Sequence, residues 1–384
     1  MTQANAAVRS THQTEESPVQ WSPDVQLIPR DQITDAQRAK IEELAFRYGE
    51  APESYDIVVS ESSVLFTPCG EGVISVFPHK RYWHIPGGIL ASDSLKPRIV
   101  KWLREISDHS GNTLLMYSLR PKLMNLCRDA GWEVNLLGVE PTLELDGLTW
   151  KGSKLSWVRR QTSYCQRAGM EIVEIQEPTE RGAMAEELLE ILMEDLAGRT
   201  FPKPLHLLEG EFDPHRLGRR RLFVARRKED KSICGFLACS PMVDGAEWAF
   251  ETYRKRDDAP RGTIAYLFRE VTDLLQAEGA KRISMCLVPG KGVDNPELAE
   301  GPKLVRFVMS LWYDHLPFMF NIRGQDYFKQ RFRPNDYPRY TCVSTRSSPG
   351  TLWSFMKTTG ATAPHPINLT RNIWKSIRSR FRKS

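Results

Sequence analysis

The sequence predicts a mixed α/β fold with two tandem halves, each built on a mostly antiparallel sheet flanked by helices. The chain has 384 residues, of which 41% are hydrophobic, and this is enough to bury two modest cores. Helical and strand periodicities alternate along its length. The same order of elements also occurs twice, and the second cycle begins near Ser153.

The first half begins with a predicted helix at 34–48, because Ile41, Leu44 and Ala45 share one helical face. Short apolar runs separated by Ser, Pro and Gly then predict strands at 55–59, 64–66 and 72–77. A helix, a strand and a second helix complete this half. Their expected ranges are 94–107, 114–117 and 119–130.

The second half repeats this order, with a helix, a strand and a longer helix ahead of three further strands. The expected ranges are 153–168, 171–175, 179–196, 221–225, 233–238 and 247–251. A helix opening at Arg261 and stopping at Gly279 is followed by a strand at 282–287. A helix after a meander, followed by a strand, is the order expected of an acetyltransferase-like half.

These elements divide the chain into four predicted segments. They are a disordered tail at 1–25, a first acetyltransferase-like domain at 26–152, a second and catalytic one at 153–345, and a basic amphipathic tail at 346–384. In the last segment Ile367, Ile373 and Trp374 can share one helical face, between basic residues. The tail is expected to contact a membrane surface, with tRNA binding or simple solvation as the alternatives.

Composition sets further limits on the class of protein. Seven cysteines occur singly, without a CxxC pair or Cys/His spacing typical of zinc sites, so we expect a reducing cytoplasm and no metal. Neither a signal peptide nor a membrane-spanning run is found, which predicts a soluble protein. GxSxG, P-loop and HExxH motifs are also missing, which excludes the hydrolase, nucleotide triphosphate and zinc protease schemes that use them.

Glu251 and Arg254 form the first candidate site. They end a predicted strand, just before the charged loop 255–258 and the turn 259–262, and therefore lie at the mouth of a mixed sheet, where substrates tend to bind. The alternative is a surface ion pair of little consequence.

The second candidate is the basic and aromatic segment 321–334. Arg323, Lys329 and Arg331 alternate there with Tyr327 and other aromatic residues, a composition suited to phosphate contacts and base stacking. An amphipathic helix with a solvated face would look the same. Three consecutive arginines, 219–221, could line a phosphate track or simply open a strand.

The sequence argues against an acyl-CoA site. Acetyltransferases that use CoA hold its pyrophosphate on backbone N–H groups of a turn with the pattern Arg/Gln-x-x-Gly-x-Gly/Ala at the start of a helix. The corresponding turn, 261–265, has one glycine and two β-branched residues.

Several motifs together resemble the C-terminal domain of phosphatidylglycerol lysyltransferases and alanyltransferases, also called multiple peptide resistance factors. The motifs are Glu251-x-x-Arg254, the block Ala-Pro-x-Gly-x-Ile-x-x-Leu-Phe at 259–268, the whole of 320–334, and Pro-Arg-Tyr at 338–340. Weaker similarity reaches back through 155–159 and 130–140. The resemblance covers roughly residues 55–343.

This resemblance implies two acetyltransferase-like domains and transfer of an aminoacyl group from aminoacyl-tRNA to a hydroxyl of a membrane lipid, with no cofactor besides the tRNA donor. It implies catalytic roles for Glu251 and Arg254. Substrate or tRNA-phosphate binding is implied for Lys329 and Arg331. Arg323, Tyr327 and Arg159 are further candidates for the same binding role. The family often has an acidic residue at the position of Ala265.

Family members that modify lipids usually carry a membrane domain ahead of these two, and here the basic tail is expected to replace it at the inner face of the membrane. Three alternatives stay open. They are a soluble small-molecule acceptor, an acyl-CoA N-acyltransferase and an RNA-binding protein without enzymatic activity.

Overall fold

The fold was analysed in a computed structural model that describes residues 20–298, 300–316 and 318–381. The elements of the first half are η1 (Arg30–Gln32), α1 (Asp35–Tyr48), η2 (Pro52–Val58), β1 (Ser63–Phe66), β2 (Gly72–His79), β3 (Tyr82–Ile85), β4 (Leu90–Ala91), α2 (Lys96–Ser110), β5 (Thr113–Leu119), α3 (Pro121–Asp129) and β6 (Glu133–Glu144). The first half thus contains all but one of the predicted elements in the predicted order, together with the unpredicted strands β3, β4 and β6.

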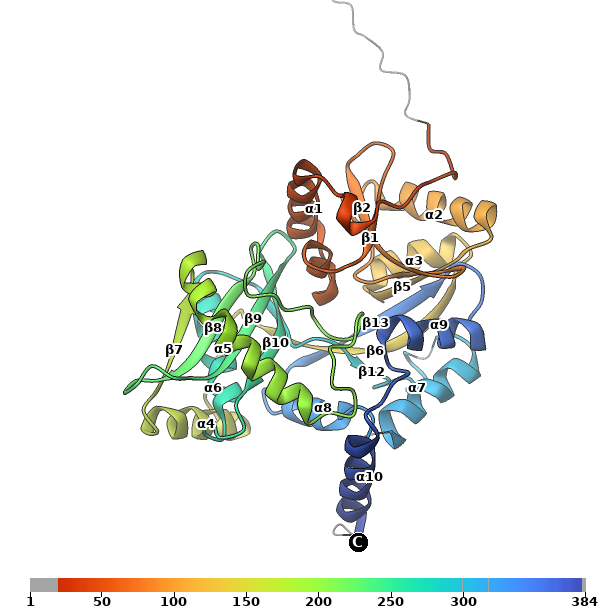
Figure 1. Ribbon diagram of the computed structural model, residues 1–384. Helices are drawn as coiled ribbons and strands as arrows, with labels where there is room; N and C mark the ends of the chain where they lie inside the picture. Colours follow the sequence, from red (N-terminus) through yellow and green to blue (C-terminus); the bar gives the residue numbers. More distant parts are fainter. Residues whose placement is uncertain (1–19, 299, 317, 382–384) are drawn as a thin grey trace, which may run out of the picture.

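The second half repeats the alternation and ends in two further helices (Figure 1). Its elements are η3 (Ser153–Leu155), α4 (Ser156–Arg167), β7 (Met170–Ile175), α5 (Pro178–Ala197), β8 (Arg221–Arg227), β9 (Ile233–Met242), β10 (Glu247–Lys255), α6 (Thr263–Ala277), β11 (Arg282–Ser284), β12 (Val288–Pro289), α7 (Lys303–His315), α8 (Ile322–Gln330), β13 (Asn335–Val343), α9 (Pro349–Thr359) and α10 (Pro366–Phe381).

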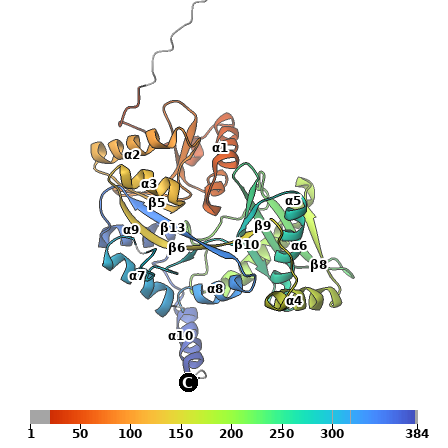
Figure 2. The same cartoon turned by 180° about the vertical axis from the view of Figure 1, so that it is seen from behind.

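One continuous sheet joins the two halves. Its strands follow the order β1-β2-β3-β5-β13-β6-β11-β10-β9-β8-β7, with β4 and β12 paired to β2 and β6 outside this path. Strand β13 is antiparallel to both β5 and β6, so residues 335–343 lie within the sheet of the first half (Figure 2). After the strands of the second half, the chain therefore returns to the sheet of the first half. The predicted boundary at residue 152 does not include this return.

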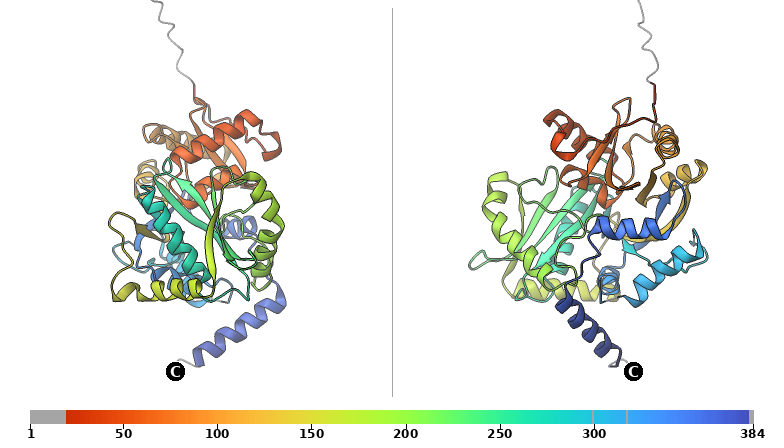
Figure 3. Two further views of the ribbon diagram at one scale, coloured as in Figure 1. Left: turned by 90° about the vertical axis from the view of Figure 1, so that its left-hand side faces the viewer. Right: turned by 45° about the vertical axis from the view of Figure 1, so that its right-hand side comes forward.

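Helices cover the sheet on both faces. In the second half α5 and α6 lie on opposite faces of β8–β10 (Figure 3). In the first half Trp83 and Ile85 of β3 point into the core under α2, whereas His84 between them points the other way and contacts Ser354 of α9. The sheet is thus the middle layer of the molecule.

The strand expected at 55–59 is wrong. Residues 55–58 belong to the 3-10 segment η2, which ends before Val59 and in which Tyr55, Asp56 and Ile57 are all buried. Pro52 opens the segment, and the Ser54 hydroxyl accepts the N–H of Ala51 and donates to the carbonyl of Gly87. Packing against α1, β9 and β10 buries the apolar residues without an alternating strand pattern.

The two terminal segments differ from each other. Residues 1–19 of the expected tail lie outside the described residues, but Trp21 packs edge-on against Trp102, whose indole N–H donates to the carbonyl of Ser22. The basic C-terminal segment does form a helix, α10, which extends away from the body (Figure 1). Within the described part of the chain, every helix is too short or too polar to cross a bilayer.

Candidate functional site

A β-bulge places the two candidate catalytic residues on one face of the sheet. The register of β10 against β9 shifts between Phe250 and Thr252, which makes Glu251 the extra residue. Phe250 and Tyr253 then both face α6, with ring centroids 4.7 and 5.0 Å from that of Phe268. Glu251 and Arg254 both face α5, although residues three apart in a regular strand point to opposite faces.

The carboxylate of Glu251 is buried, and only one of its two oxygens has hydrogen-bond or ion-pair partners. Its side chain is 4% exposed, and Oε2 accepts a hydrogen bond from Ser240 and lies 3.1 Å from Nη2 of Arg220. Oε1 is buried and has no hydrogen-bond partner among the described residues. The backbone of Gly210 lies against this carboxylate so closely that a Cβ at that position would overlap it. One oxygen is therefore fixed by two partners, while the other is buried beside Gly210 without a hydrogen-bond partner among the described residues.

Arg220 links this strand to the first half of the chain. Its Nη2 lies 2.5 Å from Oδ1 of Asp56 in η2, and its Nε donates to Ser240. Burial raises the pKa of Asp56 well above its ordinary value, and the neighbouring Glu251 carboxylate raises it further. The Arg220 guanidinium thus forms ion pairs with two carboxylates, Asp56 of the first half and Glu251 of the second.

Arg254 belongs to a separate ion network. Its Nε lies 3.1 Å from Asp195 of α5 and its Nη2 lies 3.9 Å from Glu209, and Arg199 pairs with the same two acids. Burial and the Arg199 guanidinium lower the pKa of Arg254. Glu251 and Arg254 are therefore not the exposed ion pair considered as an alternative, because their side chains are only 4% and 10% exposed and each has other partners.

Helix α8 directs its basic residues to two different places. Lys329 is 2% exposed, and its Nζ donates to the carbonyls of Cys286 and Leu287 at 3.0 and 3.3 Å. Burial lowers the pKa of this ammonium, which forms no ion pair among the described residues. Arg331 instead lies at the surface, where it donates to the hydroxyl of Tyr327. The segment predicted as one basic patch is thus divided between interior and surface.

The remaining predicted binding residues also lie at the surface. Tyr327 is 66% exposed, and Arg323 lies 3.8 Å from Asp314. Arg159 of α4 donates to the carbonyls of Trp150 and Gly152 at 2.5 and 2.7 Å. None of these three is brought to Glu251 by the fold.

Further ionisable groups surround Lys329 in the interior. Burial raises the pKa of the Cys286 thiol well above its ordinary value; the Lys329 ammonium opposes this shift, and the Glu251, Glu53 and Glu140 carboxylates reinforce it. These groups therefore share one electrostatic neighbourhood. Burial also raises the pKa of Glu53 to about 7, and its Oε2 has no hydrogen-bond partner among the described residues.

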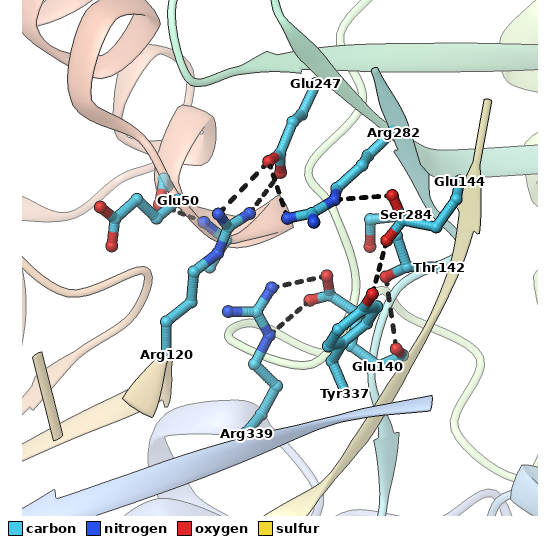
Figure 4. Close-up of polar contacts among 12 residues, drawn as sticks. Glu50, Arg120, Glu140, Thr142, Glu144, Glu247, Arg282, Ser284, Tyr337 and Arg339 are labelled. Atoms are coloured by element: carbon cyan, nitrogen blue, oxygen red, sulfur yellow. Dashed lines mark hydrogen bonds and ion pairs between the residues drawn. The ribbon is translucent and has the colours of Figure 1, made fainter. Parts of the chain in front are cut away.

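Figure 4 shows how the two halves are joined beside this interior. Arg339 of β13 holds Glu140 of β6 through two hydrogen bonds of 2.9 and 2.6 Å, and both side chains are buried. Nη1 of Arg339 has no partner within the described residues. Glu247 of β10 pairs with both Arg120 and Arg282, so strands from both halves are held together by charge.

Sequence reasoning missed Asp56, Arg220, Glu53 and Glu140 as site residues. Arg220 gave a weak signal, because it is the middle of three arginines ahead of a buried strand, but its neighbours form ordinary ion pairs with Glu43, Glu174 and Glu278. Among the described residues, no cluster of three or more Asp, Glu, His and Cys side chains is arranged to hold a metal ion.

The turn ahead of α6 is covered by α4. Gly262 has a φ of 93°, and a Cβ at this position would come within 2.6 Å of Oε1 of Gln161. Gln161 therefore occupies the space in front of the glycine, at the helix N-terminus where a CoA-dependent acetyltransferase would receive pyrophosphate.

A sequence profile of the phosphatidylglycerol lysyltransferase C-terminal domain matches residues 42–343. The chain belongs to this family. The resemblance inferred from the motifs is thereby confirmed. The phosphatidylglycerol lysyltransferase of Bacillus subtilis (strain 168) is 24% identical over 244 residues, which cover 64% of this chain and 28% of that protein. The chain thus matches less than a third of the length of this relative.

Two solved structures show the same fold. The C-terminal domain of a putative lysylphosphatidylglycerol synthetase from Agrobacterium fabrum has a TM-score of 0.70 at 20% identity, with coverage of 87% of this chain and 98% of that one. L-PGS from Bacillus licheniformis also has a TM-score of 0.70 at 20% identity, with coverage of 84% and 96%. The predicted α/β fold is confirmed, and it is the fold of these two domains.

Proposed function

We propose that this protein transfers an aminoacyl group from aminoacyl-tRNA to a hydroxyl of an anionic membrane lipid such as phosphatidylglycerol. Family membership supports a transferase, and the Bacillus subtilis relative is named for this lipid. The observation that carries the proposal is the buried Glu251 carboxylate. Arg220 and Ser240 hold one of its oxygens, and the other is free to receive a cationic or hydroxyl group of a substrate.

The reaction needs positioning more than activation, because an aminoacyl-tRNA is already an activated ester. The acceptor hydroxyl oxygen attacks the ester carbonyl carbon, a new ester bond forms, and the bond to the terminal ribose oxygen breaks. The proton leaves the acceptor hydroxyl and ends on that ribose oxygen. A protein then has to orient the acceptor, stabilise the tetrahedral oxyanion and guide one proton.

We assign Glu251 to the donor, where its free Oε1 binds the α-ammonium of the aminoacyl group or guides the proton of the acceptor. Arg254 lies on the same face of β10 and is assigned to the developing oxyanion or a neighbouring phosphate. Lys329, a buried ammonium without an ion-pair partner in the described structure, is assigned to a phosphate of either substrate. A bound phosphate would give this ammonium the ion-pair partner that it lacks among the described residues.

The donor is assigned to tRNA rather than acyl-CoA because Gln161 covers the turn at which CoA pyrophosphate would bind. In this proposal the aminoacyl-tRNA is a substrate, and no resident cofactor takes part.

The C-terminal helix is assigned to reversible membrane attachment. Its first turns are fixed to the end of α5, since Asn368 donates to the carbonyls of Ala197 and Arg199 at 2.8 Å each. The rest of the helix extends from the body and is rich in Lys and Arg in the sequence. Each cation close to an anionic leaflet contributes about 1 kcal/mol.

The direct test is incubation with a mixture of radiolabelled aminoacyl-tRNAs and vesicles containing phosphatidylglycerol, followed by lipid extraction. Label in the lipid fraction, abolished in Glu251→Ala, is the expected result. Label that appears only in a water-soluble ester or amide would replace the lipid acceptor with a small molecule. If no label leaves the tRNA under any condition, aminoacyl transfer is wrong.

A further inference from the structure

A strongly basic hollow lies at the surface along α4, away from the buried interior. It has a volume of about 550 Å³ and is lined by α4 and by the turn before α6. Four arginines line it, and none of its lining residues is acidic. They are Arg159, Arg160, Arg167 and Arg261.

A second hollow of about 340 Å³ lies on the other side of the first turn of α4, and Ser156 lines both. Its basic residues are Lys154, Arg331 and Arg333, and its lining residues also include no acid. Two aromatic rings, Trp157 and Tyr327, complete its wall. The two hollows therefore form one basic surface around the start of α4, called here the α4 track.

The positive charge of this track is not neutralised by the protein. Across the described part of the chain, none of its seven basic side chains forms an ion pair with a carboxylate, whereas the arginines at 219–221, 254 and 256 all do. Arg160, Arg167 and Arg261 are exposed. Such a concentration of unpaired guanidinium groups attracts a polyanion.

Aromatic rings are interleaved with these cations. The guanidinium of Arg331 lies 4.8 Å from the ring centroid of Trp157 and 5.6 Å from that of Tyr327. In the first hollow, Arg261 lies 4.9 Å from the ring centroid of Tyr164. Guanidinium groups suit phosphodiesters, and exposed rings beside them suit unpaired bases, which stack on aromatic and guanidinium planes. A lipid surface would use the charges but has no bases to stack on these rings.

Helix α8 connects the track with the candidate site. Tyr327 and Arg331 line the second hollow, whereas Lys329, between them in the sequence, reaches the interior carbonyl of Cys286. The ring of Phe328 lies 6.5 Å from that of Tyr253 in β10, the strand that carries Glu251. Tyr253 faces α6, whereas Glu251 faces the other side of β10. A nucleic acid end bound in the second hollow would therefore lie beside the helix that carries Lys329.

We propose that the α4 track binds the acceptor arm of tRNA, with stem phosphates on the arginines of the first hollow and the unpaired 3′ end against Tyr327 and Arg331 in the second. This inference rests on the proposed function, which it deepens by giving the donor a docking surface. Arg160, Arg167 and Arg261 are new assignments, and Arg159 acts at the edge of the track.

The test uses an acceptor-arm RNA hairpin that has an unpaired 3′ end and carries no amino acid. Its binding is measured by fluorescence anisotropy, so the test involves no acyl transfer. Arg160→Ala combined with Arg167→Ala should weaken binding at least tenfold and lower the salt slope by about 0.7–0.9 for each phosphate that is no longer neutralised. The matched control replaces Lys101 and Arg346, two exposed cations of other surfaces, and should bind like the wild type. The double Arg→Lys variant should recover most of the affinity.

The stacking part has its own test. Tyr327→Ala should weaken binding of the hairpin with the unpaired 3′ end about tenfold but leave a blunt hairpin unaffected, and Tyr327→Phe should bind like the wild type. Equal hairpin binding by the wild type and all track variants would overturn the inference and leave the proposed function standing. Loss of vesicle sedimentation in the track variants, with unchanged RNA binding, would assign the track to lipid instead. Hairpin binding at the track without any transfer from charged tRNA would overturn the proposed function alone.

Discussion

Arg220 lies 3.1 Å from Glu251 and thereby fixes one oxygen of a carboxylate whose other oxygen has no partner in the described structure. The same guanidinium contacts Asp56 from the other half of the chain, so the position of Glu251 depends on how the halves meet. A buried acid with one free oxygen is unusual unless a ligand completes it. This relationship leads to the first two predictions.

Glu251→Gln should reduce aminoacyl transfer about 100-fold or more while leaving the fold intact. Gln keeps the shape and can still accept a hydrogen bond from Ser240, but it lacks the negative charge that a substrate ammonium or a migrating proton requires. Initial rates of label transfer from charged tRNA into lipid measure the effect, and thermal unfolding checks the fold. Glu229→Gln, in an exposed turn, is the matched control. Wild-type rates in Glu251→Gln would remove this residue from the mechanism.

Arg220→Met should lower the free energy of unfolding by about 3–5 kcal/mol at pH 8, because it leaves Asp56 and Glu251 buried without a cation. The loss should be smaller at pH 5. Burial raises the pKa of Asp56, so lowering the pH shifts this carboxyl toward its neutral form and reduces the unpaired buried charge. Urea unfolding at the two pH values measures this. Arg219→Met removes a more exposed ion pair with Glu43 and should change stability by less than about 1 kcal/mol. A pH-independent loss in Arg220→Met would contradict the charge argument.

The sequence allowed most helices and strands up to Gly279 to be placed in order, because their periodicities are local patterns, and it singled out Glu251 and Arg254 at the end of one strand as candidates. For example, the side chain of Thr34 caps the N-terminus of α1, and such a capping residue can be recognised from the sequence alone. The bulge at Glu251 and the contact between Arg220 and Asp56 could not be predicted, because they arise from strand register and from residues 164 positions apart. The same holds for Lys329, since only the packing of α8 against the loop at Cys286 separates it from its surface neighbour Arg331.

The raised pKa of Glu53 predicts that the protein becomes less stable as the pH rises. Its pKa in the folded protein is about 7, above the ordinary 4.5, because burial disfavours the charged carboxylate. Its protonated form is therefore compatible with the fold, and stability is lost as the pH rises from about 5 to 8. Glu53→Gln should remove this slope and raise the free energy of unfolding at pH 8 by on the order of 2 kcal/mol. Chemical denaturation across this range measures it, with the exposed Glu61→Gln as the control that keeps the slope. A slope that persists in Glu53→Gln would assign it to another group.

Lys329→Met should lower the transfer activity without lowering the stability of the fold. The ammonium is buried without an ion pair among the described residues, so an apolar side chain of similar length should leave the free energy of unfolding unchanged or raise it. Transfer should fall by at least tenfold if this ammonium binds a substrate phosphate. Lys101→Met, on the exposed face of α2, should change neither quantity. Wild-type transfer in a stable Lys329→Met protein would show that the lysine has no part in substrate binding.

In the C-terminal helix, the basic residues expected to bind lipid are separate from the residue that fixes the helix to the body. Asn368, whose side chain holds the helix to the end of α5, precedes Arg371 and then five further basic residues in the sequence. They are Lys375, Arg378, Arg380, Arg382 and Lys383. Removal of residues 375–384 should leave the anchor in place and weaken sedimentation with phosphatidylglycerol vesicles at least 100-fold, at about 1 kcal/mol for each cation.

A variant with these five residues changed to Gln keeps the chain length and should behave like the truncation. Neutral vesicles should bind neither the wild type nor the variants. Because the anchor at Asn368 remains, transfer to a short-chain, water-soluble lipid should keep its wild-type rate in both variants, whereas transfer to vesicles should fall. Sedimentation that survives the loss of all five charges would mean that another surface holds the protein to lipid.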